Sequence, residues 1–531
     1  MEVLTSARPI YAVLVSLGAV ALIGVSSKRP NLREFWTLIA AVLKFSIVVS
    51  MLPIILQGKI IEYFLLTVVP GLEVKFRVDA LSMIFALIAT GLWIVASVYS
   101  IGYMRSLNEH AQTRFYMFFA VALLAATGIA FSGNLFTMFI FYEILTLSTY
   151  PLVAHQQTRE ATEGAQKYLA YLLGTSILFL LPAIFLTYYY AGSLEFSNHG
   201  ILVNHVPNVM VGIILVLFIA GLAKTALMPL HSWLPAAMVA PTPVSALLHA
   251  VAVVKAGAFA VIRVVLYVFG VDLLKNLGLG VILAYFASFT IIVASIVALR
   301  QDRLKLRLAY STISQLAYVV LGVALLTPSS IVGSILHIVV HAFGKITLFL
   351  AAGAIYVATK KVYVSELDGI GRKMPLTMGA FAVAAISMIG IPPLGGFISK
   401  WYLSLGALEA QQLLVIVVLL ISSLLNAGYF LPIIYAAFFK EALPTENQQQ
   451  DQLSTVRELP KPILTAAHLG IVATQPDSFR QASVFSKIRA NEAPLLMVIP
   501  LLITAGAVIV LFFWPSLFLT LARMVVAAVM A

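Results

Sequence analysis

The 531-residue sequence contains no cysteine. Structural disulfides, iron–sulfur clusters and thiolate metal sites are therefore excluded within this chain. Charged residues are also scarce, at 10% of the chain, whereas a soluble globular protein carries about a quarter. Hydrophobic residues reach 61%, and the mean hydropathy is +1.02. This composition is not that of a water-solvated domain.

Apolar runs recur along most of the sequence and are long enough to cross about 30 Å of hydrocarbon. They are continuous rather than alternating, which predicts an all-α polytopic membrane protein and excludes an outer-membrane barrel. We expect fourteen transmembrane spans, at residues 9–27, 35–56, 79–104, 114–132, 134–154, 164–191, 209–230, 242–269, 276–299, 303–326, 329–358, 375–402, 410–438 and 494–529.

The net charge of +12 is explained by how the chain is oriented in the membrane. Lysine and arginine gather in the loops that follow odd-numbered spans. The positive-inside rule therefore predicts a bacterial or archaeal-type inner (plasma) membrane protein with both termini on the outer face, and no nucleic-acid partner. The loops after even-numbered spans hold only Lys59, Lys75, Arg77 and Lys275.

Two stretches are not expected to span the membrane. Ile60–Val69 and Glu73–Val78 resemble strands around a Pro70-Gly71 turn, which predicts an outer hairpin within residues 57–78. Residues 441–492 are polar and predict a cytoplasmic loop, either a linker or a partner-docking segment. The chain then divides into spans one to three with the hairpin (1–113), a first repeat (114–269), a second repeat (276–438), the polar loop (441–492) and a C-terminal helix (494–531).

Spans seven and twelve are interrupted in similar ways. Pro229 follows Lys224 in the seventh, and Pro392-Pro393 precedes Lys400 in the twelfth. Proline inside a span frees backbone groups that only buried protein or water can satisfy. The breaks are five spans apart, and since five is odd, spans nine to thirteen are predicted to repeat spans four to eight in inverted orientation. Paired broken helices indicate a transport site, although two unrelated proline kinks are the plainer alternative.

Charged residues inside spans need a reason, because each costs about 2.5–3.5 kcal/mol at mid-bilayer. A lysine without a carboxylate partner in such a site can exchange protons near neutral pH, and histidine is suited to relay them. The predicted proton-translocating groups are Glu143, Lys224, Lys255 and Lys400, and the predicted relay groups are His249, His337, His341 and Lys345.

We expect the single acid, Glu143, to pair with Lys224, either as a switch of proton affinity or as a purely structural ion pair. His337, His341 and Lys345 are spaced four apart and line one helix face over about 12 Å. The two histidines could be haem or metal ligands, but without a second ligand set we expect no cofactor and no metal. Two further basic residues are expected to snorkel or to pair locally: Lys44 and Arg263.

Several motifs carry a family resemblance over roughly residues 70–430. They are Phe-Arg-Val-Asp at 76–79, Lys-Thr-Ala at 224–226, His-Ser-Trp-Leu-Pro at 231–235, Ala-Pro-Thr-Pro-Val-Ser-Ala-Leu-Leu-His at 240–249, Leu-Ala-Tyr-Ser-Thr-Ile-Ser-Gln at 308–315, His-Ala-Phe-Gly-Lys at 341–345 and Gly-Gly-Phe-Ile-Ser-Lys at 395–400. Together they resemble the antiporter-like subunits of respiratory complex I and the large subunits of multisubunit monovalent cation/proton antiporters.

The resemblance implies fourteen helices, inverted five-helix repeats and a central polar axis. By position, Glu143 is similar to the family's helix-five glutamate and Lys224 to its partner lysine. Lys255 resembles the central helix-eight lysine, and Lys400 the helix-twelve ionisable residue near the channel exit. The polar helix-eleven positions are matched by His337 and His341.

Lys400 stands where one complex I antiporter-like subunit has glutamate. The chain resembles most the D-type large subunit of the cation/proton antiporters, although the polar loop 441–492 is unusual for that type. The resemblance implies a proton-conducting subunit of a multisubunit Na+/H+ antiporter, with other membrane subunits, lipid, protons and sodium as partners. The alternative is a proton-pumping subunit of a redox-driven complex, either complex I-like or a membrane-bound hydrogenase. A third reading is a passive scaffold. This chain itself shows no redox or hydrolytic site.

Overall fold

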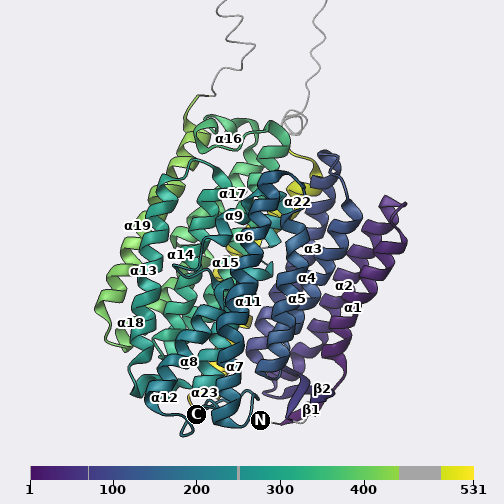
Figure 1. Ribbon diagram of the computed structural model, residues 1–531. Coiled ribbons are helices and arrows are strands. Elements are labelled where there is room, and N and C mark those ends of the chain that lie inside the picture. Colours follow the sequence, from purple (N-terminus) through teal and green to yellow (C-terminus); the bar gives the residue numbers. More distant parts are fainter. Residues whose placement is uncertain (1, 70, 248–250, 442–491) are drawn as a thin grey trace, which may run out of the picture.

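The computed structural model describes residues 2–69, 71–247, 251–441 and 492–531, and this part of the chain is predominantly helical (Figure 1). Eleven of its helices are long and apolar enough to cross a membrane. They are α1 (Arg8–Val25), α2 (Pro30–Leu56), α3 (Ala80–Ser106), α4 (Gln112–Ala130), α5 (Leu135–Val153), the continuous helix of α6 (Arg159–Thr175), η1 (Ser176–Leu180) and α7 (Leu181–Ala191), α13 (Leu279–Arg300), α14 (Leu304–Ala324), α15 (Pro328–Thr359), α19 (Leu413–Phe439) and α22 (Leu495–Phe513).

Shorter helices complete the bundle. Three of them are apolar and of ten to seventeen residues: α8 (Asn208–Gly221), α17 (Pro375–Ile389) and α23 (Ser516–Val529). The others are η2 (Ala223–Thr225), α9 (Trp233–Ala236), η3 (Ala237–Val239), α10 (Thr242–Ala246), α11 (Val253–Val264), η5 (Val265–Phe269), α12 (Val271–Asn276), η6 (Val364–Glu366), α16 (Ile370–Lys373) and α18 (Gly395–Glu409).

The all-α membrane fold is confirmed, and the eleven long helices coincide with eleven of the predicted spans. The other three predicted spans, seven, eight and twelve, are each assembled from shorter pieces. The last predicted span is not one helix: α22 ends at Phe513 and α23 begins at Ser516. The intervening Pro515 has no N–H to continue the backbone ladder. The count of fourteen crossings and the inverted repeat remain predictions.

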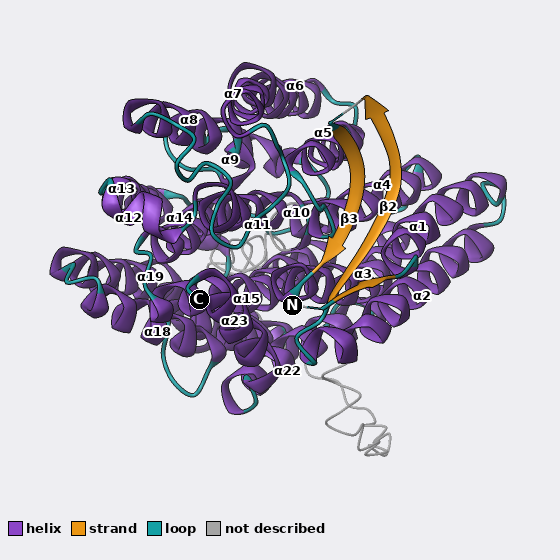
Figure 2. Ribbon diagram, turned by 90° about the horizontal axis from the view of Figure 1, so that it is seen from below, coloured by secondary structure: helices purple, strands orange, loops and turns teal. Residues whose placement is uncertain are grey.

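A small sheet lies across part of one end of the bundle (Figure 2). The predicted hairpin is present as β2 (Ile60–Val69) and β3 (Leu72–Val78), which pair antiparallel with Ile61 opposite Val78. A third strand, β1 (Val3–Thr5), was not predicted and pairs parallel with β2. Its three residues are too few to show a recognisable alternation in the sequence.

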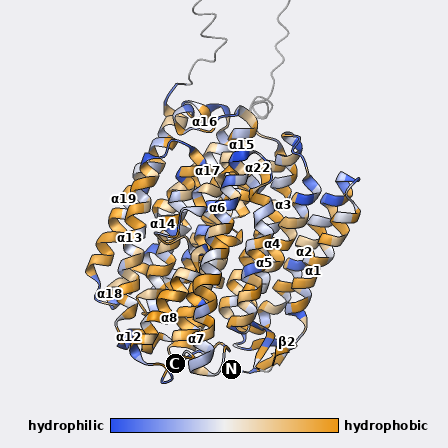
Figure 3. Ribbon diagram, in the orientation of Figure 1, coloured by the Kyte–Doolittle hydropathy of each residue, from blue (hydrophilic) through white to orange (hydrophobic). Residues whose placement is uncertain are grey.

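The two termini lie at the same end of the molecule, and α16 lies at the opposite end (Figure 1). Hydrophobic residues predominate along the length of the helices, as Figure 3 shows. This distribution is that of a multi-pass membrane protein. The predicted polar loop 441–492 lies outside the described residues except for its first and last positions.

A buried ion pair fastens the sheet end to the helices. The Arg263 guanidinium donates to both carboxylate oxygens of Asp79, at 2.6 and 3.0 Å, and also to the Ser82 hydroxyl. Asp79 in turn caps α3 by accepting from the Ser82 backbone N–H. Arg263 therefore pairs rather than snorkels, but its partner is remote in sequence and not local as expected. Lys44 is fully buried and donates to Ser16 Oγ and the Leu123 carbonyl.

Candidate functional site

The first helix break places Lys224. Helix α8 ends at Gly221, and Lys224 lies in the short turn η2 beyond it. A Cβ at Gly221 would lie 2.4 Å from the backbone nitrogen of Leu180, so only glycine lets α8 rest directly on η1. This segment η1 is π-helical, and such segments occur frequently at functional sites.

The second break places Lys400. Helix α17 ends at Ile389 and α18 begins at Gly395, with a Cβ at Gly396 falling only 1.7 Å from the Ser387 carbonyl oxygen. The Lys400 ammonium donates to the Ile389 carbonyl at 2.8 Å and to Ser423 Oγ at 3.1 Å. The last carbonyls of a helix have no partner within it and carry the negative end of its dipole. The break therefore creates the acceptor that holds the lysine.

Glu143 and Lys224 do not form the predicted ion pair: among the described residues, no acidic oxygen lies within 4.0 Å of the Lys224 ammonium. Lys224 Nζ instead donates to the Tyr142 carbonyl at 3.0 Å and Thr146 Oγ1 at 2.7 Å, and it lies 3.2 Å from the Tyr142 ring centre. Glu143 accepts from Ser176 Oγ at 2.5 Å. Neighbouring helical residues point about 100° apart, so Tyr142 faces the lysine while Glu143 faces η1.

The centre of the bundle holds a direct lysine–histidine contact. Lys255 Nζ, on α11, lies 2.5 Å from His341 Nδ1 on α15. One turn away on α15, His337 Nδ1 lies 2.9 Å from Ser399 Oγ, and the two histidine rings are 6.1 Å apart between centres. The predicted stripe on α15 is therefore present as a line of buried polar groups.

Tyr318 connects this line to Lys400. Its ring stacks on His337 with 5.3 Å between centres, and the Lys400 ammonium lies 5.2 Å from the same ring. A cation over an aromatic face is stabilised by the ring quadrupole. Ser399 and Lys400 are adjacent on α18, so this helix contacts both the histidine line and the second break.

Lys345 lies on a side branch. Its ammonium donates to Ser311 Oγ at 2.7 Å and to the Leu308 carbonyl at 3.3 Å, both on α14. Ser311 also lies 2.9 Å from the Tyr429 hydroxyl. Lys345 is fully buried and does not lie near a helix end. His249 is outside the described residues.

Helix α11 packs against the first break through Gly257. A Cβ there would lie 2.4 Å from the Thr225 backbone nitrogen and 2.9 Å from Lys224 Cβ. The helix that carries Lys255 is thus in backbone contact with the turn that carries Lys224. From Lys255, printed contacts lead to His341, His337, the Tyr318 ring and Lys400 in turn, while Lys224 is linked to Lys255 through the packing of α11 on η2.

Sequence reasoning missed the neutral partners of these groups. Their residue types are common in helices, and only their position inside apolar spans could have marked them. They are Thr146, Ser176, Ser311, Tyr318, Ser399 and Ser423.

Buried polar atoms without a protein partner occur beside these groups. Among the described residues, Glu143 Oε2 and both amide atoms of Gln315 have none. Buried groups of this kind are typical binding positions for ordered water. The histidines of α15 contact a lysine and a serine, which gives no support to haem or metal ligation there.

A family model for the membrane segment of NADH:quinone oxidoreductase and Mrp antiporters matches residues 132–426. The chain belongs to this family. A second model, for the N-terminus of NADH-ubiquinone oxidoreductase (complex I) chain 5, matches residues 70–116. The matched residues include every element that carries the polar line, so the predicted antiporter-like family is confirmed.

Individual relatives also align with much of this chain. NADH-quinone oxidoreductase subunit N of Desulforudis audaxviator is 35% identical over 443 residues, covering 82% of this chain and 87% of the relative. The chain spans about half the length of several chloroplast NAD(P)H-quinone oxidoreductase subunit 5 relatives.

Two solved structures share the fold of the family. The Mrp complex from Dietzia sp. contains a chain with a TM-score of 0.81 at 23% identity, covering 98% of this chain and 96% of that one. The archaeal membrane-bound sulfane sulfur reductase contains another, with a TM-score of 0.80 at 24% identity and 99% and 98% coverage.

The contact at Gly257 gives a prediction about packing. Gly257→Ala forces a methyl group into the backbone of the Lys224 turn, and overpacking of this kind costs about 1–3 kcal/mol. We expect a lower thermal midpoint of the purified chain in detergent. Gly379→Ala in α17, where nothing lies within 4 Å, is the matched control and should not lower the midpoint. Equal midpoints for both variants would show that the contact does not constrain α11.

Proposed function

We propose that this chain is a proton-translocating subunit of a multisubunit monovalent cation/proton antiporter. The observation that carries the proposal is the 2.5 Å contact between Lys255 Nζ and His341 Nδ1, at the centre of a buried polar line in a membrane bundle. Membership of the complex I/Mrp family supports it. Ionisable groups at this depth are rare and are associated with ion pathways.

The chemistry at the central contact is a proton exchange. When Lys255 is charged and the His341 ring is neutral, the ammonium can donate to Nδ1, which leaves a neutral amine and an imidazolium. The proton then continues past His337 towards Lys400, through side chains or through water at the unpaired polar atoms. Within the described part of the chain, no carboxylate lies beside Lys255 to hold its proton by charge, so transfer in either direction is feasible.

Glu143 and Lys224 form the other end of the proposed path. Glu143 accepts a hydrogen bond from Ser176 Oγ, and its Oε2 has no protein partner among the described residues. The Lys224 ammonium donates to two neutral oxygens of α5. A rotation of the glutamate side chain towards η2 would bring a negative charge nearer the lysine and strengthen its hold on a proton. The glutamate is thereby proposed as a switch rather than as a permanent partner.

Sodium is not proposed to follow this line. Hard cations are bound by several oxygen ligands, preferably including carboxylates. The proposed path supplies one carboxylate, Glu143, and otherwise mostly nitrogen groups. We therefore assign sodium movement to other membrane subunits of the antiporter.

Lys255→Arg tests proton exchange directly. Arginine keeps the charge and cannot release its proton, so transport by the reconstituted complex should fall by at least about tenfold. This is a lower bound, because a positioned proton donor usually contributes more than about tenfold to a rate. Lys44→Arg is the control, since Lys44 is equally buried but lies among α1, α2 and α4, outside the line. Thermal midpoints of both variants report folding. Unchanged transport in a folded Lys255→Arg complex would contradict proton exchange at Lys255 and favour the passive scaffold.

A second candidate function is a proton-pumping subunit of a redox-driven complex. The observation in its favour is the 35% identity to an NADH-quinone oxidoreductase subunit N over most of both chains. The fold does not distinguish between the two functions, because it occurs both in an Mrp complex and in a sulfane sulfur reductase. Since this chain has no cysteine, any iron–sulfur centre must lie in another subunit.

The partners that co-purify with the chain separate these two functions. An affinity tag on the chain, mild detergent and mass spectrometry identify them. The antiporter predicts other membrane subunits only. Iron–sulfur subunits in stoichiometric amount would replace the first proposal with the second.

We also propose the orientation that the basic loops predict, in an inner or plasma membrane with both termini outside. The shared end of the two termini is compatible with it (Figure 1). The absence of cysteine makes labelling simple. A single cysteine in place of Arg372 should react with a membrane-impermeant maleimide only after the membrane is opened, and one in place of Lys275 should react in intact cells. The reverse pattern contradicts the orientation.

A further inference from the structure

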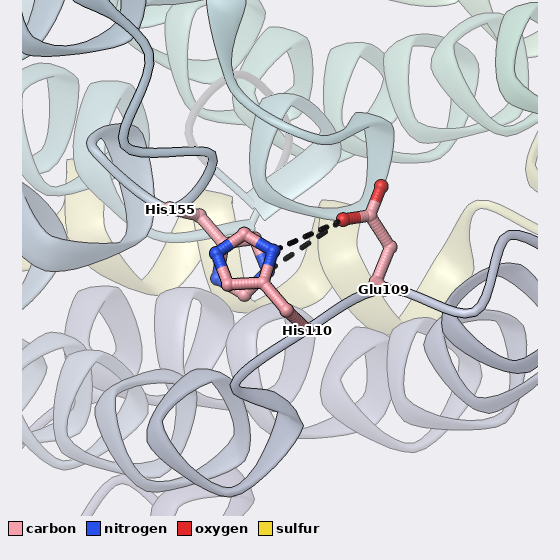
Figure 4. Close-up of side chains that lie close together, drawn as sticks. All are labelled: Glu109, His110 and His155. Atoms are coloured by element: carbon pink, nitrogen blue, oxygen red, sulfur yellow. Dashed lines mark ion pairs between the residues drawn. The ribbon is translucent and has the colours of Figure 1, made fainter.

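Two loops bring a carboxylate and two imidazoles together outside the proposed proton path. Glu109 and His110 lie between α3 and α4, and His155 follows the end of α5. Figure 4 shows both rings beside the Glu109 carboxylate. Glu109 Oε2 lies 4.0 Å from His110 Nδ1 and 3.9 Å from His155 Nε2. One ligand atom from each residue lies within 4.8 Å of the others.

His155 is the unexplained member of this cluster. Its side chain is 0% exposed, and neither ring nitrogen has a hydrogen-bond partner among the described residues. A buried imidazole without a partner is costly unless something else binds it. The ring is held in place by Phe115, which packs edge-on at 5.7 Å between centres, and by His110 at 4.8 Å. Its nitrogens are therefore fixed beside the Glu109 carboxylate.

The other two groups allow adjustment. The Glu109 side chain is 13% exposed and that of His110 is 49% exposed. In a tetrahedral zinc site, metal–ligand bonds of about 2.1 Å place ligand atoms about 3.4 Å apart. Glu109 must therefore approach each ring by only about half an ångström, and the larger gap between the two imidazoles closes by rotation of the exposed His110.

Glu109 supplies the negative charge that a bound cation needs. Burial raises the pKa of the Glu109 carboxyl, because its negative charge lacks solvation, and a bound cation would offset this. Burial, followed by the charges of His110 and Arg114, lowers the pKa of His155 to about 4, so the ring is neutral at pH 7. The neutral imidazole is the form that binds metal. Arg114 is the nearby cation, and its guanidinium donates to the His155 carbonyl.

We propose that Glu109, His110 and His155 bind a divalent transition-metal ion of the zinc class. Two imidazoles and one carboxylate are a ligand set that suits zinc and leaves one position open to water. The ion would tie the α3–α4 loop to the end of α5, the helix that carries Glu143. Restraint of α5 would then slow proton movement. This last consequence rests on the proposed function, whereas the binding itself does not.

Nothing in the sequence marked this site, and no metal was expected. The adjacent Glu109 and His110 are a weak signal by themselves, and the third ligand comes from a separate loop. Within the described residues, Glu109, His110 and His155 form the one group of three His or acidic side chains close enough together to share an ion.

Binding is tested with the complete chain, purified through a tag without histidine and stripped of metal. Zn2+ is titrated by calorimetry, and Co2+ is added separately to record its visible absorption. One equivalent should bind. His110→Ala and Glu109→Gln should each weaken Zn2+ binding by at least about tenfold, and His110→Ala should abolish or alter the Co2+ spectrum. The exposed His205→Ala, in the loop before α8, is the control and should bind as the parent chain does.

His110 is the decisive position because its exposed side chain can be shortened to alanine without opening a cavity, and the thermal midpoint verifies that the variant is folded. Absence of stoichiometric binding, or equal affinity of the parent chain and His110→Ala, would overturn the metal site. Transport is measured separately in proteoliposomes. Zn2+ should slow the parent complex but not the His110→Ala complex. Binding without any effect on transport would retain the site and overturn its regulatory role.

Discussion

Five lysine side chains lie buried in this bundle, and within the described residues none has a carboxylate within ion-pair distance. The low-dielectric interior penalises such charges, so each must be stabilised by neutral oxygens, ring faces or a histidine. The five are Lys44, Lys224, Lys255, Lys345 and Lys400. Much of the architecture supplies these acceptors. The end of α17 offers the Ile389 carbonyl to Lys400, and α5 offers a carbonyl and a hydroxyl to Lys224.

The same constraint explains why the helices are broken. An intact span uses its carbonyls internally, whereas a terminus leaves several free and directs its dipole at whatever lies beyond. Glycines then allow the broken pieces to approach closely, as Gly221 does on η1 and Gly396 on α17. Asp79 and Arg263 show the contrast. This buried pair has full charge compensation and holds the sheet end to α11, outside the line of lysines and histidines.

Most of the fold could be predicted from the sequence, because membrane spans depend on composition and length. That spans seven and twelve are interrupted could be predicted because proline has a local, known effect. The second break contains Pro392, whereas α8 already ends at Gly221, before Pro229 is reached. The partners of Glu143 could not be predicted. Sequence spacing fixes how far a side chain lies along a helix but not how two helices are rotated towards each other. For the same reason, the meeting of Glu109 and His110 with His155 was not foreseen, whereas the alignment of His337 and His341 on a single helix was.

Proton exchange at Lys255 is the central claim, and its protonation state can be observed in the reconstituted complex. Solid-state NMR of chain labelled with 15N-lysine resolves ammonium from neutral amine nitrogens, and the Lys255→Arg variant identifies the signal. Proton exchange predicts that Lys255 shows both forms within the pH range in which the complex transports, in proportions that change with pH. A signal that remains ammonium throughout that range would contradict the claim.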